Sequence, residues 1–119
     1  MRQAYAHEAV LVMEPAADVR APGALITVAL CGHWEHEPPC PLAPHHTGAE
    51  RIGGHVRLRI LFAAEPEAED TVRQRIDTAL AEGRLHGPDG VTTRWRLHDS
   101  GPIDVPAQDR DHAERLTRT

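Results

Sequence analysis

The chain has 119 residues, the size of one domain, and its 40% of hydrophobic residues can build a modest core. The formal net charge of −5 argues against a general affinity for nucleic acid, because phosphate binding needs a basic surface. No apolar run approaches the length of about eighteen residues that a membrane span requires. The apolar run at 9–13 is also too short for a signal peptide, so we expect a cytoplasmic protein.

Hydrophobic patterning and turn residues predict six segments in chain order. They are a strand at 8–14, a strand at 24–31, a Cys/His-rich loop at 31–48, a strand at 55–62, a helix at 65–83 and a strand at 91–99. The run "ALITVALC" at 24–31 is the most apolar in the chain, and it is interpreted as a buried, central strand. The prolines of the following loop argue against both a helix and a paired strand there.

The segment "EPEAEDTVRQRIDTALAEG" carries the strongest helix signals. Pro66 suits the first helical position, acids crowd the first turn, and Gly83 is a natural stop. An apolar stripe runs along one helical face through Val72, Ile76, Ala79 and Leu80.

The fold class that follows is α+β, a two-layer sandwich of order β-β-loop-β-α-β. One main helix covers one face of an approximately four-stranded, mixed or antiparallel sheet, and the other face is open. Residues 1–102 form the single domain, and 103–119 form a charged tail that is a short helix or disordered. The strand–helix–strand half would fit a ferredoxin-like unit, but the first half lacks room for a matching helix.

The loop "CGHWEHEPPCPLAPHHTG" concentrates chemistry in a short stretch of chain. It contains both cysteines and four of the nine histidines: Cys31, His33, His36, Cys40, His45 and His46. Thiolate and imidazole are the ligands that zinc prefers, and four of them would close a tetrahedral site. Copper, nickel or iron would suit the same set. Which four of the six candidates bind, and whether Cys31 and Cys40 ever pair as a disulfide, stays open.

Three classes of function follow from these residues. The first is a small metal-binding protein that holds, senses or delivers a metal ion, or a metal-stabilised accessory subunit, with a protein partner or a second copy of the chain as further partners. The alternative is a protein-interaction or anionic-ligand module on the open sheet face, carried by Arg57, Arg59, Arg94 and Arg96 if their strands are neighbours. The third is a small metal-dependent enzyme. The isolated histidines His7, His86 and His112 are assigned no role.

Overall fold

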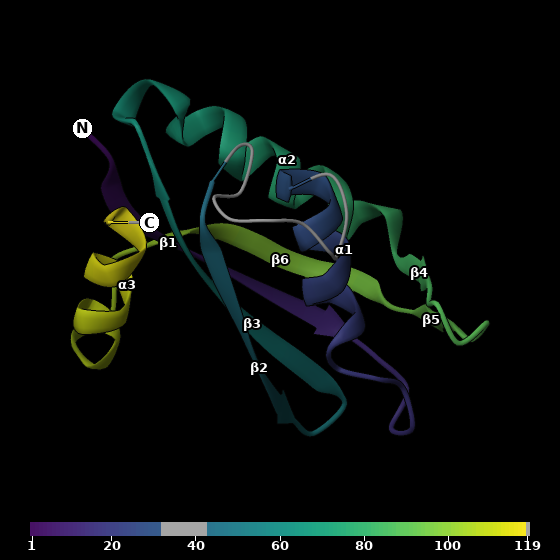
Figure 1. Ribbon diagram of the computed structural model, residues 1–119. Coiled ribbons are helices and arrows are strands. Elements are labelled where there is room, and N and C mark those ends of the chain that lie inside the picture. Colours follow the sequence, from purple (N-terminus) through teal and green to yellow (C-terminus); the bar gives the residue numbers. More distant parts are fainter. Residues whose placement is uncertain (32–42, 119) are drawn as a thin grey trace.

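The computed structural model describes residues 1–31 and 43–118, and it shows an α+β protein built around a four-stranded antiparallel sheet (Figure 1). The sheet order is β2 (His45–Ile52), β3 (His55–Ala64), β1 (Gln3–Val12) and β6 (Arg96–Ile103). A separate two-stranded sheet pairs β4 (Arg84–His86) with β5 (Thr92–Arg94). The expected α+β class and the sheet-and-helix layering are confirmed.

Two helices, α1 (Ala21–Cys31) and α2 (Glu69–Glu82), pack on the same face of the sheet and against each other (Figure 1). The order β1-α1-β2-β3-α2-β6, with β1 between β3 and β6, is the split β-α-β arrangement of ferredoxin-like folds. The short turn η1 (Pro66–Ala68) leads into α2. Among the described residues, no helix is long and apolar enough to cross a membrane.

The strand expected at 24–31 is wrong, because these residues form most of helix α1. A continuous apolar run has no period that distinguishes a buried strand from a buried helix. The signals that favour the helix are its length, the proline at its second position, and the spacing of Ile26 and Leu30, four residues apart. Both side chains are almost fully buried, at 0% and 2% exposure. The first half of the chain therefore does contain the matching helix that a ferredoxin-like unit requires.

Strand β2 is the second correction, because the expected elements include no strand at 45–52 and place 45–48 in the Cys/His-rich loop. It pairs with β3 through a two-residue turn of Gly53 and Gly54, and Gly53 has a φ of 61° that suits such a turn. Just before β2, the carbonyl of Pro44 accepts the N–H of Ala63 at 3.0 Å. The proline-rich stretch of the sequence therefore ends at Pro44, where strand pairing with β3 begins.

The core lies between the sheet and the two helices. On β3, Val56, Leu58, Ile60 and Phe62 all point to the helix side and are fully buried, as their alternation predicts. The predicted stripe of α2, from Val72 to Leu80, is also buried. The expected strand at 91–99 is divided into β5 and β6 by Trp95, which is 7% exposed and donates its Nε1–H to the carbonyl of Leu80 at 2.9 Å.

The C-terminal segment forms a short turn, η2 (Ala107–Asp109), and helix α3 (Arg110–Thr117). Of the two outcomes expected for the tail, it is the helix that forms. Helix α3 packs on β1 and β3, and Ala113 is buried at 1% exposure in this contact. His112 meets His46 and Asp109 meets Arg59, so α3 covers part of the sheet face that α1 and α2 leave open.

A glycine pair tests how α2 is joined to β6. Gly83 ends α2 with a φ of 71°, and a Cβ there would stand 2.7 Å from the carbonyl oxygen of Trp95. Gly90 has a φ of 84°, but a Cβ there would meet nothing within 4 Å. We expect Gly90→Ala to cost about 1 kcal/mol, from the left-handed backbone alone, and Gly83→Ala to cost clearly more. Urea denaturation measures both, and equal losses would contradict the close approach at Trp95.

Candidate functional site

The candidate metal ligands are distributed around the connection between α1 and β2. Cys31 is the last residue of α1, and its backbone is described. His33, His36 and Cys40 lie outside the described residues. His45 and His46 are the first two residues of β2, so their positions test whether adjacent histidines can share a metal ion.

His45 and His46 point to opposite faces of the sheet. His45 lies opposite Phe62, whose side chain is in the core, whereas His46 lies opposite Leu61. The ring of His46 sits 4.6 Å from the ring of His112 on α3, on the other face. Because successive side chains of a strand alternate, the two imidazoles are separated by the sheet itself. Only one of them can join a site at the end of α1, and that one is His45.

The hydrogen bonds of His45 define its tautomer. Nδ1 lies 3.1 Å from the carbonyl oxygen of Ala43, and Nε2 lies 3.0 Å from Oγ1 of Thr27 on α1. A carbonyl oxygen can only accept, so Nδ1 carries the hydrogen and Nε2 directs its lone pair toward the helix. Histidines that ligate metals usually donate their other N–H to a carbonyl or carboxylate in this way. The Nδ1 atom of His45 is therefore held as it would be in an Nε2 ligand, and a metal ion on Nε2 would replace the contact with Thr27.

Thr27 lies one helical turn before the end of α1. Its Oγ1 also lies 3.2 Å from the carbonyl oxygen of Gly23, and its single hydrogen can be donated either to that carbonyl or to Nε2 of His45. Cys31 follows Thr27 by four residues, which places the two positions about 6 Å apart along one side of α1. The imidazole of His45 is thus held within one turn of the chain position that supplies the first cysteine.

Within residues 1–31 and 43–118, no three His, Cys, Asp or Glu side chains are grouped closely enough to hold a metal ion. A site with His45 therefore needs further ligands from the segment that joins α1 to β2. The sequence supplies Cys31, His33, His36 and Cys40 there.

The four arginines of the alternative hypothesis do not form one platform. Arg57 and Arg59 share β3, and Arg96 lies on β6, but β1 separates these two strands. Arg94 belongs to β5 in the smaller sheet. The condition for the platform, that the two arginine-bearing strands are neighbours, is not met.

Acidic side chains accompany the two arginines of β3. An Nη2–H of Arg57 donates to Oε2 of Glu50 at 2.9 Å, and the hydrogen bond raises the pKa of this guanidinium. Arg59 has looser ion pairs, at 4.0 Å to Glu8 and 3.5 Å to Asp109. Ion pairs this exposed contribute little to stability. The two arginines nevertheless differ, because only Arg57 is tightly paired.

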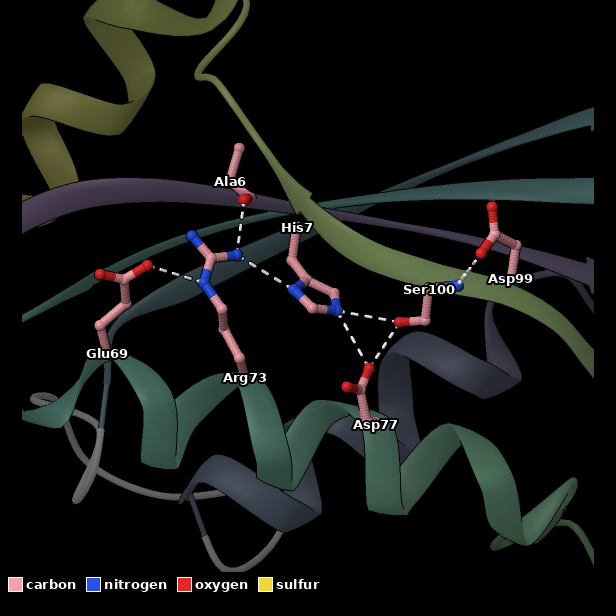
Figure 2. Close-up of polar contacts among 7 residues, drawn as sticks. All are labelled: Ala6, His7, Glu69, Arg73, Asp77, Asp99 and Ser100. Carbon is pink, nitrogen blue, oxygen red and sulfur yellow. Dashed lines mark hydrogen bonds and ion pairs between the residues drawn. The ribbon is translucent and has the colours of Figure 1, made fainter.

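A partly buried polar cluster around the buried His7 ring was missed from the sequence (Figure 2). His7 lies on β1, only 1% exposed, between the core side chains of that strand and helix α2. Its Nδ1 accepts an N–H from Arg73 at 3.0 Å, and Nε2 lies 3.0 Å from Oδ1 of Asp77 and 2.9 Å from Oγ of Ser100. The hydroxyl of Ser100 also donates to the same Asp77 oxygen at 2.5 Å. One sequence signal for this burial was available, because strand alternation places His7 on the same face as Ala9 and Leu11.

The cluster contains serine, histidine and aspartate, but its hydrogen bonds indicate a structural role and not a catalytic one. A guanidinium can only donate, so Nδ1 of His7 is an acceptor and Nε2 carries the hydrogen. An imidazole with Nε2–H cannot remove the proton of Ser100, as a catalytic triad would require. Arg73 is itself fixed by Glu69 at 2.8 Å and by the carbonyl of Ala6 at 2.8 Å (Figure 2). The network therefore joins β1 to α2 and β6 by satisfying buried polar atoms.

No protein-family model matches the chain. The comparison with curated proteins also finds no significant match. The function is therefore argued from these residues and their geometry.

The His7 cluster makes stability depend on pH. Burial, above all, lowers the pKa of His7 below its ordinary 6.5, despite the opposing effect of Asp77. The folded protein keeps the ring neutral, while the unfolded chain gains a proton as the pH falls through about 6.5. We expect His7→Gln to cost about 1–3 kcal/mol at pH 7.5, because it breaks the hydrogen bonds of a buried ring. This cost should shrink toward pH 5, where the wild-type protein loses that advantage.

Urea denaturation at several pH values measures the difference. His86→Gln, at an exposed position of β4, is the control for general loss of a histidine. A cost of His7→Gln that stays constant or grows between pH 7.5 and 5 would contradict the neutral, buried ring.

Proposed function

We propose that this is a small metal-binding protein whose site lies where α1 joins β2. The observation that carries the proposal is the orientation of His45, with Nδ1–H on the carbonyl of Ala43 and Nε2 directed toward α1. The remaining ligands come from Cys31, His33, His36 and Cys40, which precede it in the sequence. His46 is left out of the set because it lies on the other sheet face.

Zinc is the first candidate for this site. Mixed thiolate and imidazole ligands suit its tetrahedral coordination, and four of the five remaining candidates are enough. Copper, nickel and iron follow, because the same donor atoms bind them. A reduced, cytoplasmic location would keep both cysteines as thiols ready to bind metal.

The metal would fasten α1 to the edge of the sheet, or the protein would sense the metal or deliver it. A closed four-ligand site favours holding or sensing, whereas a metal-dependent enzyme would need an open coordination position. Partners in delivery, or a second copy of the chain, would meet the site at the edge strand β2.

Two adjacent histidines provide a matched test. We expect His45→Gln to weaken zinc binding at least about tenfold, because it removes a ligand, and His46→Gln to leave it unchanged. Competition titration of Zn²⁺ against a chromophoric chelator measures both affinities on untagged protein. Circular dichroism of each metal-free variant establishes that it folds.

The double variant Cys31→Ser/Cys40→Ser tests the thiolates independently. Zinc content after purification without a histidine tag should fall from about one per chain to well below it. A wild-type content under about 0.1 metal per chain, together with no response to added zinc, would rule out the proposal.

A further inference from the structure

A groove of about 650 Å³ lies on the outward side of the helix layer, between α1 and α2. Helix α1 contributes Leu25, Val28 and Ala29 to it, and these three residues are partly exposed. Helix α2 contributes the buried Ala79 and five exposed polar residues: Thr71, Gln74, Arg75, Thr78 and Glu82. The groove therefore has one apolar wall and one largely polar wall.

The outward side of α1 is apolar because this helix contains no charged residue. Its one hydroxyl belongs to Thr27, which turns toward β2 and lies 3.0 Å from Nε2 of His45. Ile26 and Leu30 face the core and are almost fully buried. A helix on a sheet usually presents charged side chains to water, and a helix that is apolar all round is usually covered. The sheet covers only one side of α1, so we expect a second surface on the other.

Helix α2 places two opposite charges beside this apolar wall. Arg75 and Glu82 are seven residues apart, so they lie on the same side of the helix but about 10 Å from each other, too far to pair. Neither has an opposite charge three or four residues away, the spacing of helix ion pairs. Within the described part of the chain, the guanidinium of Arg75 makes only a 3.4 Å contact with the carbonyl oxygen of Ala29, and Glu82 has no ion pair. Both charges are therefore available to a second chain.

The two helices run in opposite directions. Arg75, in the first half of α2, reaches Ala29 near the end of α1. Leu85, just after α2, shares a hollow with Ala21 at the start of α1. The midpoint between Arg75 and Glu82 therefore lies at about the level of the middle of α1.

This arrangement makes the surface complementary to a copy of itself. A two-fold axis that passes between two copies at this level, perpendicular to the helices, places Arg75 of each copy beside Glu82 of the other. The same axis places Leu25 of each copy opposite Val28 of the other. Thr78, a small residue, lies where the two α2 helices meet. Such a contact closes after two copies and does not continue into a filament.

We propose that the outward side of α1 and α2 is the interface of a two-fold symmetric dimer of this chain. Apolar contacts between the two α1 helices cover the side that the sheet leaves open, and two Arg75–Glu82 ion pairs fix the register of the α2 helices. The interface needs no metal ion, so it is tested apart from the proposed metal site.

The area of this surface limits the affinity. Helices of 11 and 14 residues are about 16 and 21 Å long, and side by side they offer a patch of about 20 by 20 Å. This patch is smaller than the roughly 800 Å² per partner of a standard interface. We therefore expect a dimer in exchange with its monomer, with a Kd of about 1–100 µM.

Sedimentation equilibrium of the full-length, untagged protein at about 5 to 500 µM measures this association. EDTA and a reducing agent are present, so that neither a bridging metal nor an intermolecular disulfide contributes. We expect Arg75→Glu and Glu82→Arg each to weaken association at least about tenfold, because like charges then meet twice across the axis. The double variant Arg75→Glu/Glu82→Arg should restore the wild-type affinity, since both ion pairs form again with their charges exchanged. Arg94→Glu on β5, outside this surface, is the matched control and should have no effect.

Val28→Glu tests the apolar contact. It should leave the protein monomeric, because it would bury an unpaired charge in the dimer, while circular dichroism shows the wild-type fold. The proposal is overturned if the wild-type protein is monomeric at about 500 µM, if Arg75→Glu associates as well as Arg94→Glu, or if the double variant associates no better than the single variants. These charge variants change exposed side chains of α2, so they decide the question even where Val28→Glu does not fold.

Discussion

The central position of β1 is the constraint on which the rest of the structure depends. Both of its edges are occupied, one by β3 and the other by β6, and β2, which a two-residue turn joins to β3, lies on the outer side of β3. Strands β1 and β2 both run antiparallel to β3 and hence parallel to each other, and such strands need a crossover between them. Helix α1 makes that crossover. Its end and the start of β2 are the two fixed ends of the Cys/His-rich segment.

The sheet then separates two kinds of chemistry by the alternation of its side chains. On the helix-covered face, hydrogen bonds hold both the buried ring of His7 and the partly buried ring of His45. On the opposite face, His46 meets His112 beside Arg59, in a hollow that water reaches. One step along β2 thus separates the proposed metal ligand His45 from a histidine on the other face of the sheet.

The sequence predicts the parts of this fold in which hydrophobic residues recur with a clear period. The alternation of β3 and the apolar stripe of α2 both identify buried faces correctly. The run at 24–31 is apolar throughout, so its pattern does not distinguish a strand from a helix. Pro22 in the first turn and the crossover between the parallel strands β1 and β2 both favour the helix. The opposite directions of His45 and His46 could be expected only once β2 was known to begin at His45. The contacts of His7 and His112 join residues far apart in the chain, so local patterns do not indicate them.

The most direct test of the central claim is the protonation state of the histidine rings, measured by long-range ¹H–¹⁵N NMR. In metal-free protein His45 should have its hydrogen on Nδ1. On addition of one equivalent of Zn²⁺, its Nε2 resonance should move to the range of metal-bound imidazole while Nδ1 keeps its hydrogen, and His46 should not change. A His45 ring with its hydrogen on Nε2, or a zinc-induced change at His46 in place of His45, would contradict the account.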